Sequence, residues 1–222
     1  MVNKILKAKG IFRPDLSDAI KLYTEEARFC QPDPENSHLS VIYRLRESYG
    51  ERCDYLEIGC LFGFSMVNAT RSKTPGKFVG IDLFESTGEI AMNNYSADVI
   101  DRNLSLEKTT SLVERCNIHN HSVSFIKGNS QWGAIRMKAM SLCPNGFDMM
   151  FIDGDHSFEG TYADFLHYEP LLRTDGYMLF DDQDYPEIDE AIHQIKDKHS
   201  EKYEWVSWDG YAPKFKGFFV KK

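Results

Sequence analysis

The stretch that decides the fold is Tyr55-Leu56-Glu57-Ile58-Gly59-Cys60-Leu61-Phe62-Gly63-Phe64-Ser65. The apolar residues before Gly59 predict a strand, and those after Gly63 predict a helix. The two glycines allow a sharp turn between these elements and the close approach of a ligand to the main chain. They are four residues apart and follow Glu57, so the pattern is neither the GxGxxG turn of dinucleotide-binding folds nor a P-loop. An acidic turn of this kind favours a ligand without phosphates.

A second acid further along the chain supports this interpretation. Asp82 lies 23 residues after Gly59 and ends the predicted strand 77–81. Acids at about this spacing bind ribose hydroxyls in dinucleotide folds. A ligand with a ribose and a positive charge suits such a site, and S-adenosylmethionine has both. Two structural alternatives stay open: the glycines can serve a tight turn without a ligand, and Asp82 can be a helix N-cap.

Strands and helices are predicted to alternate along the rest of the chain. The expected strands cover residues 54–58, 77–81, 123–126, 147–152, 177–180, 203–208 and 216–221. The expected helices begin near residues 39, 65, 106, 158 and 186, and the fourth places Phe158, Tyr162, Phe165 and Leu166 on one face. This alternation favours an α/β fold with a doubly wound, mostly parallel sheet, in which ligands bind beyond the carboxyl ends of the strands. The short loop between the last two strands favours an antiparallel pair.

Acidic residues stand at the predicted carboxyl ends of several strands, which meet along one edge of such a sheet. If the strands before Asp153 and Asp181 are neighbours, the carboxylates of Asp153, Asp181 and Asp182 converge. Carboxylates within a few Å of one another raise each other's pKa. A hard divalent cation such as Mg²⁺ relieves the repulsion between them. Alternatively, Asp181 and Asp182 cap the loop into the next helix.

The segment after Asp153 offers a general base for a hydroxyl held near such a cation. His156 follows three residues later, and its ordinary pKa near neutrality suits proton removal. Asp155 is the rival for this role, and His156 can instead pack or cap at a helix start. The string Asp153-Gly154-Asp155 is also a DxD pattern, which in a glycosyltransferase binds a metal ion and a nucleotide-sugar diphosphate. That alternative does not explain the glycine turn.

Four strings in this order carry a resemblance to a known family. They are ExGxxxGxS at 57–65, IDLFE at 81–85, FIDGDHSFEG at 151–160 and GYMLFDD at 176–182. Over roughly residues 50–222 the chain resembles class I S-adenosylmethionine-dependent methyltransferases. Within these it is similar to a subfamily of small-molecule O-methyltransferases that includes enzymes acting on sugars of macrolide and aminocoumarin antibiotics. Catechol-type metal-dependent enzymes are distant relatives of that subfamily.

The resemblance implies a seven-stranded Rossmann-like sheet whose last two strands form an antiparallel hairpin. The cofactor-binding residues that it implies are Glu57, Gly59, Gly63, Ser65, Asp82, Asn129, Ser130 and Asp153. In this assignment the methionine end of the cofactor lies near Glu57, the ribose at Asp82 and the adenine near 128–130. The residues implied to hold Mg²⁺ or another divalent cation are Asp153, Asp181 and Asp182. The resemblance leaves the choice of base between His156 and Asp155 open.

The predicted function is therefore O-methylation of a hydroxyl on a small molecule, either a sugar-containing metabolite or a vicinal diol. Residues 37–222 are expected to form the class I methyltransferase domain, and residues 1–36 a helical arm. In relatives such arms cover the active site or a subunit interface, so a homodimer is compatible with the sequence. The alternatives are the DxD-type glycosyltransferase and a non-catalytic module that binds S-adenosylmethionine without turnover.

The composition of the 222 residues argues against several other classes. A net charge of −8 disfavours nucleic acid as a general partner, and 42% hydrophobic residues exclude disorder over most of the chain. No apolar stretch approaches the ~18 residues of a membrane span, and the N-terminus lacks the apolar segment of a secretory signal. The five cysteines are widely spaced and suggest neither a disulfide framework nor a zinc site. These features predict a cytoplasmic protein with reduced, packed thiols.

Overall fold

The computed structural model describes residues 39–85, 105–207 and 215–222. The predicted arm at 1–36 and most of the segment 84–104 lie outside these residues. The strands are β1 (Tyr55–Ile58), β2 (Lys77–Asp82), β3 (Ser122–Lys127), β4 (Phe147–Ile152), β5 (Leu172–Phe180), β6 (Tyr203–Ser207) and β7 (Gly217–Lys221). The helices are α3 (Leu39–Tyr49), α4 (Phe64–Thr70), α5 (Leu106–Cys116), α6 (Gly133–Leu142), α7 (Phe158–Tyr168), the short η1 (Glu169–Leu171) and α8 (Pro186–Lys198).

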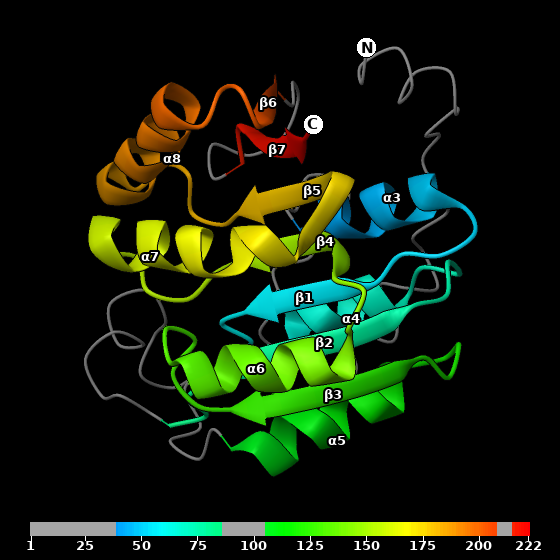
Figure 1. Ribbon diagram of the computed structural model, residues 1–222. Coiled ribbons are helices and arrows are strands. Elements are labelled where there is room, and N and C mark those ends of the chain that lie inside the picture. The colour runs from blue at the N-terminus through cyan, green and yellow to red at the C-terminus, as the bar shows by residue number, and fades with distance from the viewer. Residues whose placement is uncertain (1–38, 86–104, 208–214) are drawn as a thin grey trace.

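The strands form one seven-stranded sheet in the order β3-β2-β1-β4-β5-β7-β6 (Figure 1). The first five strands, β1 to β5, run parallel to one another. β7 lies between β5 and β6 and is antiparallel to both. The predicted doubly wound α/β sheet with an antiparallel C-terminal strand is confirmed. The strand order reverses between β1 and β4, and folds of this kind bind ligands beyond the carboxyl ends of the strands at such a point.

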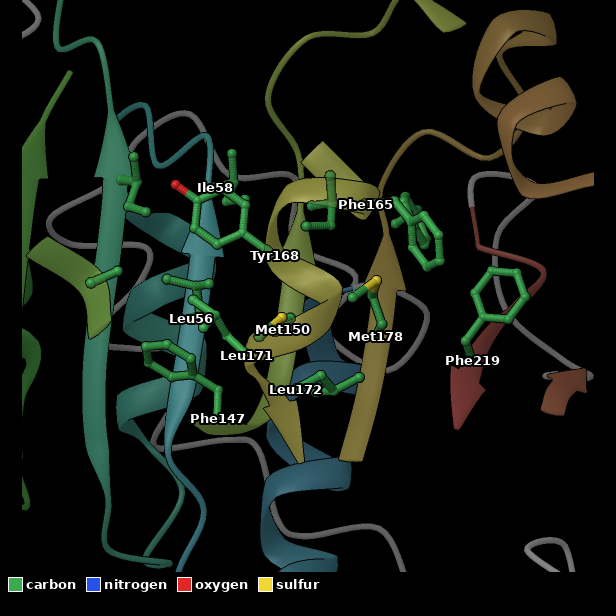
Figure 2. Close-up of a cluster of buried hydrophobic side chains, with 14 of the residues drawn as sticks. Leu56, Ile58, Phe147, Met150, Phe165, Tyr168, Leu171, Leu172, Met178 and Phe219 are labelled. Carbon is green, nitrogen blue, oxygen red and sulfur yellow. The ribbon is translucent and has the colours of Figure 1, made fainter. Parts of the chain in front are cut away.

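Helices cover both faces of the sheet and enclose a hydrophobic core on each side (Figure 1). α6, α7 and α8 pack on one face, and α3, α4 and α5 on the other. On the first face, Leu56 and Met150 of the sheet pack in the same cluster as Phe165 and Tyr168 of α7 (Figure 2). The central strands are therefore buried on both sides, which explains their continuous apolar sequences.

The buried face of α7 overlaps only in part with the predicted one. Phe165 and Tyr168 are fully buried, whereas Leu166 is 45% exposed. Neighbouring residues point about 100° apart around a helix, so Leu166 does not share the face of Phe165 as the sequence suggested. The inward stripe runs instead through Thr161, Asp164, Phe165 and Tyr168.

Two elements depart from the sequence prediction. The sequence analysis did not predict α6. In this helix Ile135 and Ala139 are buried, whereas Met137 and Met140 are exposed, so no continuous apolar stripe marks it in the sequence. β5 begins at Leu172 rather than at residue 177. Its first half contains polar residues such as Arg173, whose guanidinium forms ion pairs with acids from two neighbouring segments.

Two further expectations concern thiols and membranes. The four described cysteines, Cys53, Cys60, Cys116 and Cys143, are free and buried, as expected for packed thiols. Within residues 39–85, 105–207 and 215–222, no helix combines the length and the apolar character needed to cross a membrane.

Candidate active site at the carboxyl edge of the sheet

The carboxyl ends of the central strands bring the predicted site residues to one edge. Gly59, Asp153 and Asp181 directly follow β1, β4 and β5. The Asp153 amide donates to the carbonyl oxygen of Ile58 at 2.7 Å, and the Asp181 amide donates to that of Ile152 at 3.0 Å. The three turns therefore lie side by side at the point where the strand order reverses.

The first turn depends on its two glycines. Gly59 has φ of +82° and Gly63 has φ of +83°, in the left-handed region that favours glycine. A Cβ atom at Gly59 would overlap the carbonyl oxygen of Asp153, and one at Gly63 would lie 2.8 Å from Cγ2 of Val113. The turn is thus pressed against the β4 turn on one side and against α5 on the other.

Glu57 is buried beneath this turn. Its Oε1 accepts a hydrogen bond from the Ser65 hydroxyl at 2.6 Å, and its Oε2 accepts one from the Tyr55 hydroxyl at 2.8 Å. Burial raises the pKa of the Glu57 carboxyl to about 8. Two of the predicted cofactor residues, Glu57 and Ser65, are therefore brought together, and the hydrogen bond between their side chains ties β1 to α4.

Replacing Glu57 with glutamine is expected to reduce the loss of stability at alkaline pH. The ordinary pKa of this carboxyl is 4.5, and in the folded protein it is about 8, so the folded state binds the proton more tightly. The contribution of this raised pKa to the free energy of unfolding is complete below about pH 4.5. It decreases as the pH rises towards 8, by up to about 1.4 kcal/mol per pH unit. Urea unfolding from about pH 5 to about pH 9 measures this. The exposed Glu204→Gln change is the control and keeps the wild-type slope; an equal slope in Glu57→Gln contradicts the prediction.

Asp82 shapes the first turn from the neighbouring strand. Its Oδ2 accepts hydrogen bonds from the amides of Cys60 at 2.7 Å and Leu61 at 2.8 Å, and its Oδ1 accepts one from the amide of Phe84 at 2.6 Å. The carboxylate therefore lies at the glycine turn, where the sequence analysis placed it. It accepts hydrogen bonds from the main-chain amides of two loops and does not cap a helix.

The loop after β3 contains the two residues predicted to lie near an adenine. Asn129 uses its side-chain oxygen to accept a hydrogen bond from the Gln131 amide at 2.8 Å, as turn residues commonly do. Ser130 behaves differently, because its hydroxyl donates to Oδ1 of Asp164 at 2.7 Å. The carbonyl oxygen of Ser130 also accepts a hydrogen bond from the Tyr168 hydroxyl at 2.8 Å. Helix α7 therefore holds Ser130 at two points.

The acidic cluster gathers around His156. Nε2 of His156 lies 3.3 Å from Oδ1 of Asp153, and Nδ1 lies 3.7 Å from Oδ2 of Asp182. Asp181 and Asp182 are only 8% and 6% exposed. The ring of His156 also meets the ring of Tyr185 edge-on at 5.7 Å between centroids. The structure therefore brings Asp153 and Asp182 to either side of His156.

Burial and repulsion set the protonation of this cluster. Desolvation, followed by the charge of Asp181, raises the pKa of Asp153 to about 7. The hydrogen bond to Asp153 raises the pKa of His156 above its ordinary value of 6.5. Asp153 and His156 therefore hold protons more tightly than the free side chains do.

The donor set of this cluster fits a hard divalent cation in its chemistry, since Mg²⁺ prefers carboxylate oxygens and binds few of them. The side chains are arranged otherwise, with His156 between Asp153 and Asp182. Among the residues that the structure describes, no group of three or more His, Cys, Asp or Glu side chains is spaced to hold a metal ion. A cation at these acids therefore requires His156 to leave its contact with at least one of them.

Asp155, the rival base, has contacts at the start of α7. Its Oδ1 accepts a hydrogen bond from the Ser157 amide at 2.9 Å, and its main-chain oxygen accepts one from the Thr161 hydroxyl at 2.9 Å. Its carboxylate also occupies the space in which a side chain at Gly160 would lie. Asp155 therefore serves the turn into α7.

Asp164 is a buried acid beside these turns that the sequence analysis did not single out. It is 1% exposed on α7, and its Oδ2 lies 3.2 Å from where a Cβ of Gly154 would be. Burial raises its pKa to about 6. The sequence does contain a signal: Asp164 lies on the same helical stripe as Thr161 and Tyr168, and a carboxylate on an apolar stripe is unusual.

Comparisons with known proteins agree with this architecture. Residues 56–183 match the family model described as a methyltransferase domain. The chain is 31% identical over 164 residues to an uncharacterized protein of Acanthamoeba polyphaga mimivirus; the match covers 71% of this chain and 66% of that relative, just under two thirds of its length.

Two solved structures share the fold. An O-methyltransferase from Bacillus cereus in complex with SAH is 17% identical, with a TM-score of 0.61 and coverage of 100% of this chain and 97% of that chain. The apo structure of CalS11, a TDP-rhamnose 3'-O-methyltransferase, is 14% identical, with a TM-score of 0.57 and coverage of 99% and 93%. The family model covers more than half of the chain, including the glycine turn and the acidic edge, and the chain therefore belongs to the methyltransferase-domain family.

Proposed function

We propose that the protein transfers the methyl group of S-adenosylmethionine to a hydroxyl oxygen of a small molecule, assisted by a divalent cation and His156. The observation that carries this proposal is that Asp153 belongs to both halves of the site. Its main-chain carbonyl borders the Gly59 turn, and its carboxylate contacts His156. A methyl donor at the turn and a hydroxyl at the acids are then neighbours, as direct transfer requires.

The glycine turn suits S-adenosylmethionine as the donor. It contains no phosphate-binding lysine, and acids surround it, which favours a ligand with a positive sulfonium. Asp82 lies beside the turn through its bonds to Cys60 and Leu61, where its remaining lone pairs can accept ribose hydroxyls. The Bacillus cereus enzyme, which shares the fold, was solved with SAH, the demethylated form of this cofactor.

The reaction is a displacement at the methyl carbon. The acceptor oxygen forms a C–O bond while the C–S bond breaks, and the electron pair of that bond stays on sulfur. The hydroxyl proton passes to Nε2 of His156, so the products are a methyl ether, S-adenosylhomocysteine and a proton. A bound Mg²⁺ supplies Lewis acidity, which lowers the pKa of the hydroxyl, and a fixed position for it.

His156 is the better candidate for the base. It lies among the acids that would hold the cation, and its side chain keeps 27% of its surface exposed, so an acceptor can reach the ring. Asp155 is bound to the start of α7 instead. The residues that would hold the cation are Asp153, Asp181 and Asp182. Nε2 of His156 contacts Asp153, and it would accept the proton once it leaves that contact.

The acceptor class that we propose is a sugar-containing metabolite or another vicinal diol. Two adjacent hydroxyls would offer oxygen ligands to a cation held by these acids, which would fix the reacting oxygen. CalS11 acts on a TDP-linked rhamnose, which supports a sugar as the first choice. Membership of the methyltransferase-domain family favours methyl transfer over the glycosyltransferase alternative.

Ligand-induced stabilisation tests the donor and the cation. S-adenosylhomocysteine at about 100 times its Kd is expected to stabilise the protein by about 2.7 kcal/mol, which raises Tm by several degrees, whereas UDP is expected to have no effect. Mg²⁺ is expected to add a further increment that EDTA removes and that Asp153→Asn abolishes. The exposed Asp197→Asn change keeps the increment and is the matched control. The measurement is thermal unfolding with each ligand.

The same samples separate the alternatives. A shift with UDP and Mg²⁺ but not with the adenosyl ligand would favour glycosyl transfer. A shift with S-adenosylhomocysteine without release of that product from S-adenosylmethionine, over a panel of sugar and diol acceptors, would favour a non-catalytic binding module. Stabilisation by Mg²⁺ that survives Asp153→Asn would place the cation elsewhere.

A further inference from the structure

Helix α7 places a buried carboxylate behind the loop that follows β3. Asp164 is 1% exposed, and Oδ1 accepts the hydrogen bond of the Ser130 hydroxyl at 2.7 Å. Its other oxygen, Oδ2, lies 3.2 Å from the position that a Cβ atom at Gly154 would occupy. The carboxylate thus lies between the β3–α6 loop and the β4–α7 turn.

This contact fixes the direction of the Ser130 hydroxyl. A serine hydroxyl has one proton to donate and two lone pairs that accept. Because the proton points to Asp164, Ser130 Oγ can only accept from any other partner. The raised pKa of Asp164, about 6, leaves the carboxylate ionised and able to accept at pH 7.5, so the direction holds under ordinary conditions.

We propose that Asp164 is a positioning residue that makes Ser130 a hydrogen-bond acceptor for the exocyclic amino group of the cofactor's purine, and thereby selects adenine over a 6-oxopurine. This inference rests on the proposed function, in which the loop 128–130 lies near the adenine. An adenine presents a donor at its 6-position, and a 6-oxopurine presents an acceptor there. An acceptor facing an acceptor leaves both groups without a hydrogen bond, which weakens binding.

Tyr168 offers an internal comparison. It lies one helical turn after Asp164 and donates to the main-chain carbonyl of Ser130, so it holds the loop without touching the hydroxyl. Asp164 and Tyr168 therefore separate two effects on the same residue. Loss of the Tyr168 hydroxyl loosens the loop, whereas loss of the Asp164 carboxylate frees the hydroxyl proton to donate to a ligand.

The test compares S-adenosylhomocysteine with S-inosylhomocysteine, which differ only at the purine, by isothermal titration of the full chain. We expect the wild type to bind the adenosyl ligand at least about tenfold more tightly. Asp164→Ala and Ser130→Ala are each expected to reduce this ratio at least about fivefold, and the double variant no further, because both act on one hydrogen bond. Ser130→Thr, which keeps a hydroxyl, is expected to retain the wild-type ratio of the two affinities. Tyr168→Phe is the matched control, in which both affinities decrease alike and the ratio stays.

The outcomes distinguish this inference from the proposed function. If neither ligand binds the wild type, the proposed function fails. If the adenosyl ligand binds but the ratio is unchanged in Asp164→Ala and Ser130→Ala, the proposed function stands and the role of Asp164 is refuted. If circular dichroism shows that Asp164→Ala does not fold, Ser130→Ala still decides. That change removes the proposed acceptor, so an affinity ratio that stays at the wild-type value would refute the inference.

Discussion

Gly59→Ala is expected to destabilise the protein by roughly 2–6 kcal/mol and to remove its stabilisation by S-adenosylhomocysteine. A non-glycine residue at a φ of +82° costs about 1–3 kcal/mol. The added Cβ would also overlap the carbonyl oxygen of Asp153, and relief of such crowding in a packed region costs a further 1–3 kcal/mol or so. The colliding group is main chain, so a side-chain rotation cannot relieve it.

Urea unfolding and ligand-induced shifts in Tm measure these effects. Gly133→Ala is the matched control: Gly133 begins α6, and a Cβ there has no neighbour within 4 Å. That change is expected to be neutral or to stabilise by up to about 1 kcal/mol. If Gly59→Ala is as stable as Gly133→Ala and still responds to the ligand, then the β1 and β4 turns do not need their close approach.

The edge of the sheet could be predicted from sequence because it depends on main-chain geometry. Parallel strands put their carboxyl ends on one edge whatever their side chains, so Gly59, Asp82, Asp153 and Asp181 come together once the strands are recognised. The apolar runs that mark β1, β2 and β4 are long enough to recognise. α6 could not be predicted, since two buried residues, Ile135 and Ala139, do not produce a helical pattern.

The partners of the polar side chains could not be predicted, because they depend on contacts between distant segments. Glu57 binds Ser65 and Tyr55, although the residue types equally permit an exposed carboxylate facing a ligand. The bond between Ser130 and Asp164 joins residues 34 apart in the chain. The sequence thus indicates which residues reach the site, and packing decides which of them face a ligand and which hold the others in place.

His156→Ala is expected to lower kcat by about 10²–10⁴-fold, the usual contribution of a general base, with little change in the affinity for S-adenosylhomocysteine. His156 lies among Asp153, Asp181 and Asp182, where the acceptor hydroxyl is proposed to bind, whereas the cofactor turn is formed by other residues. Removing the imidazole therefore removes the proton acceptor and leaves the donor site intact. Product formation with the best acceptor of the panel, together with titration of S-adenosylhomocysteine, measures both quantities.

Two further experiments identify the role of the imidazole. Free imidazole is expected to restore part of the activity of His156→Ala, because a small base can enter the space that the side chain leaves, and it is expected not to affect the wild type. Asp155→Asn is expected to lose less than about tenfold, because asparagine can still accept the Ser157 amide and begin α7. If Asp155→Asn instead loses 10² or more while His156→Ala stays active, Asp155 is the base, and His156 serves to neutralise the acids around it.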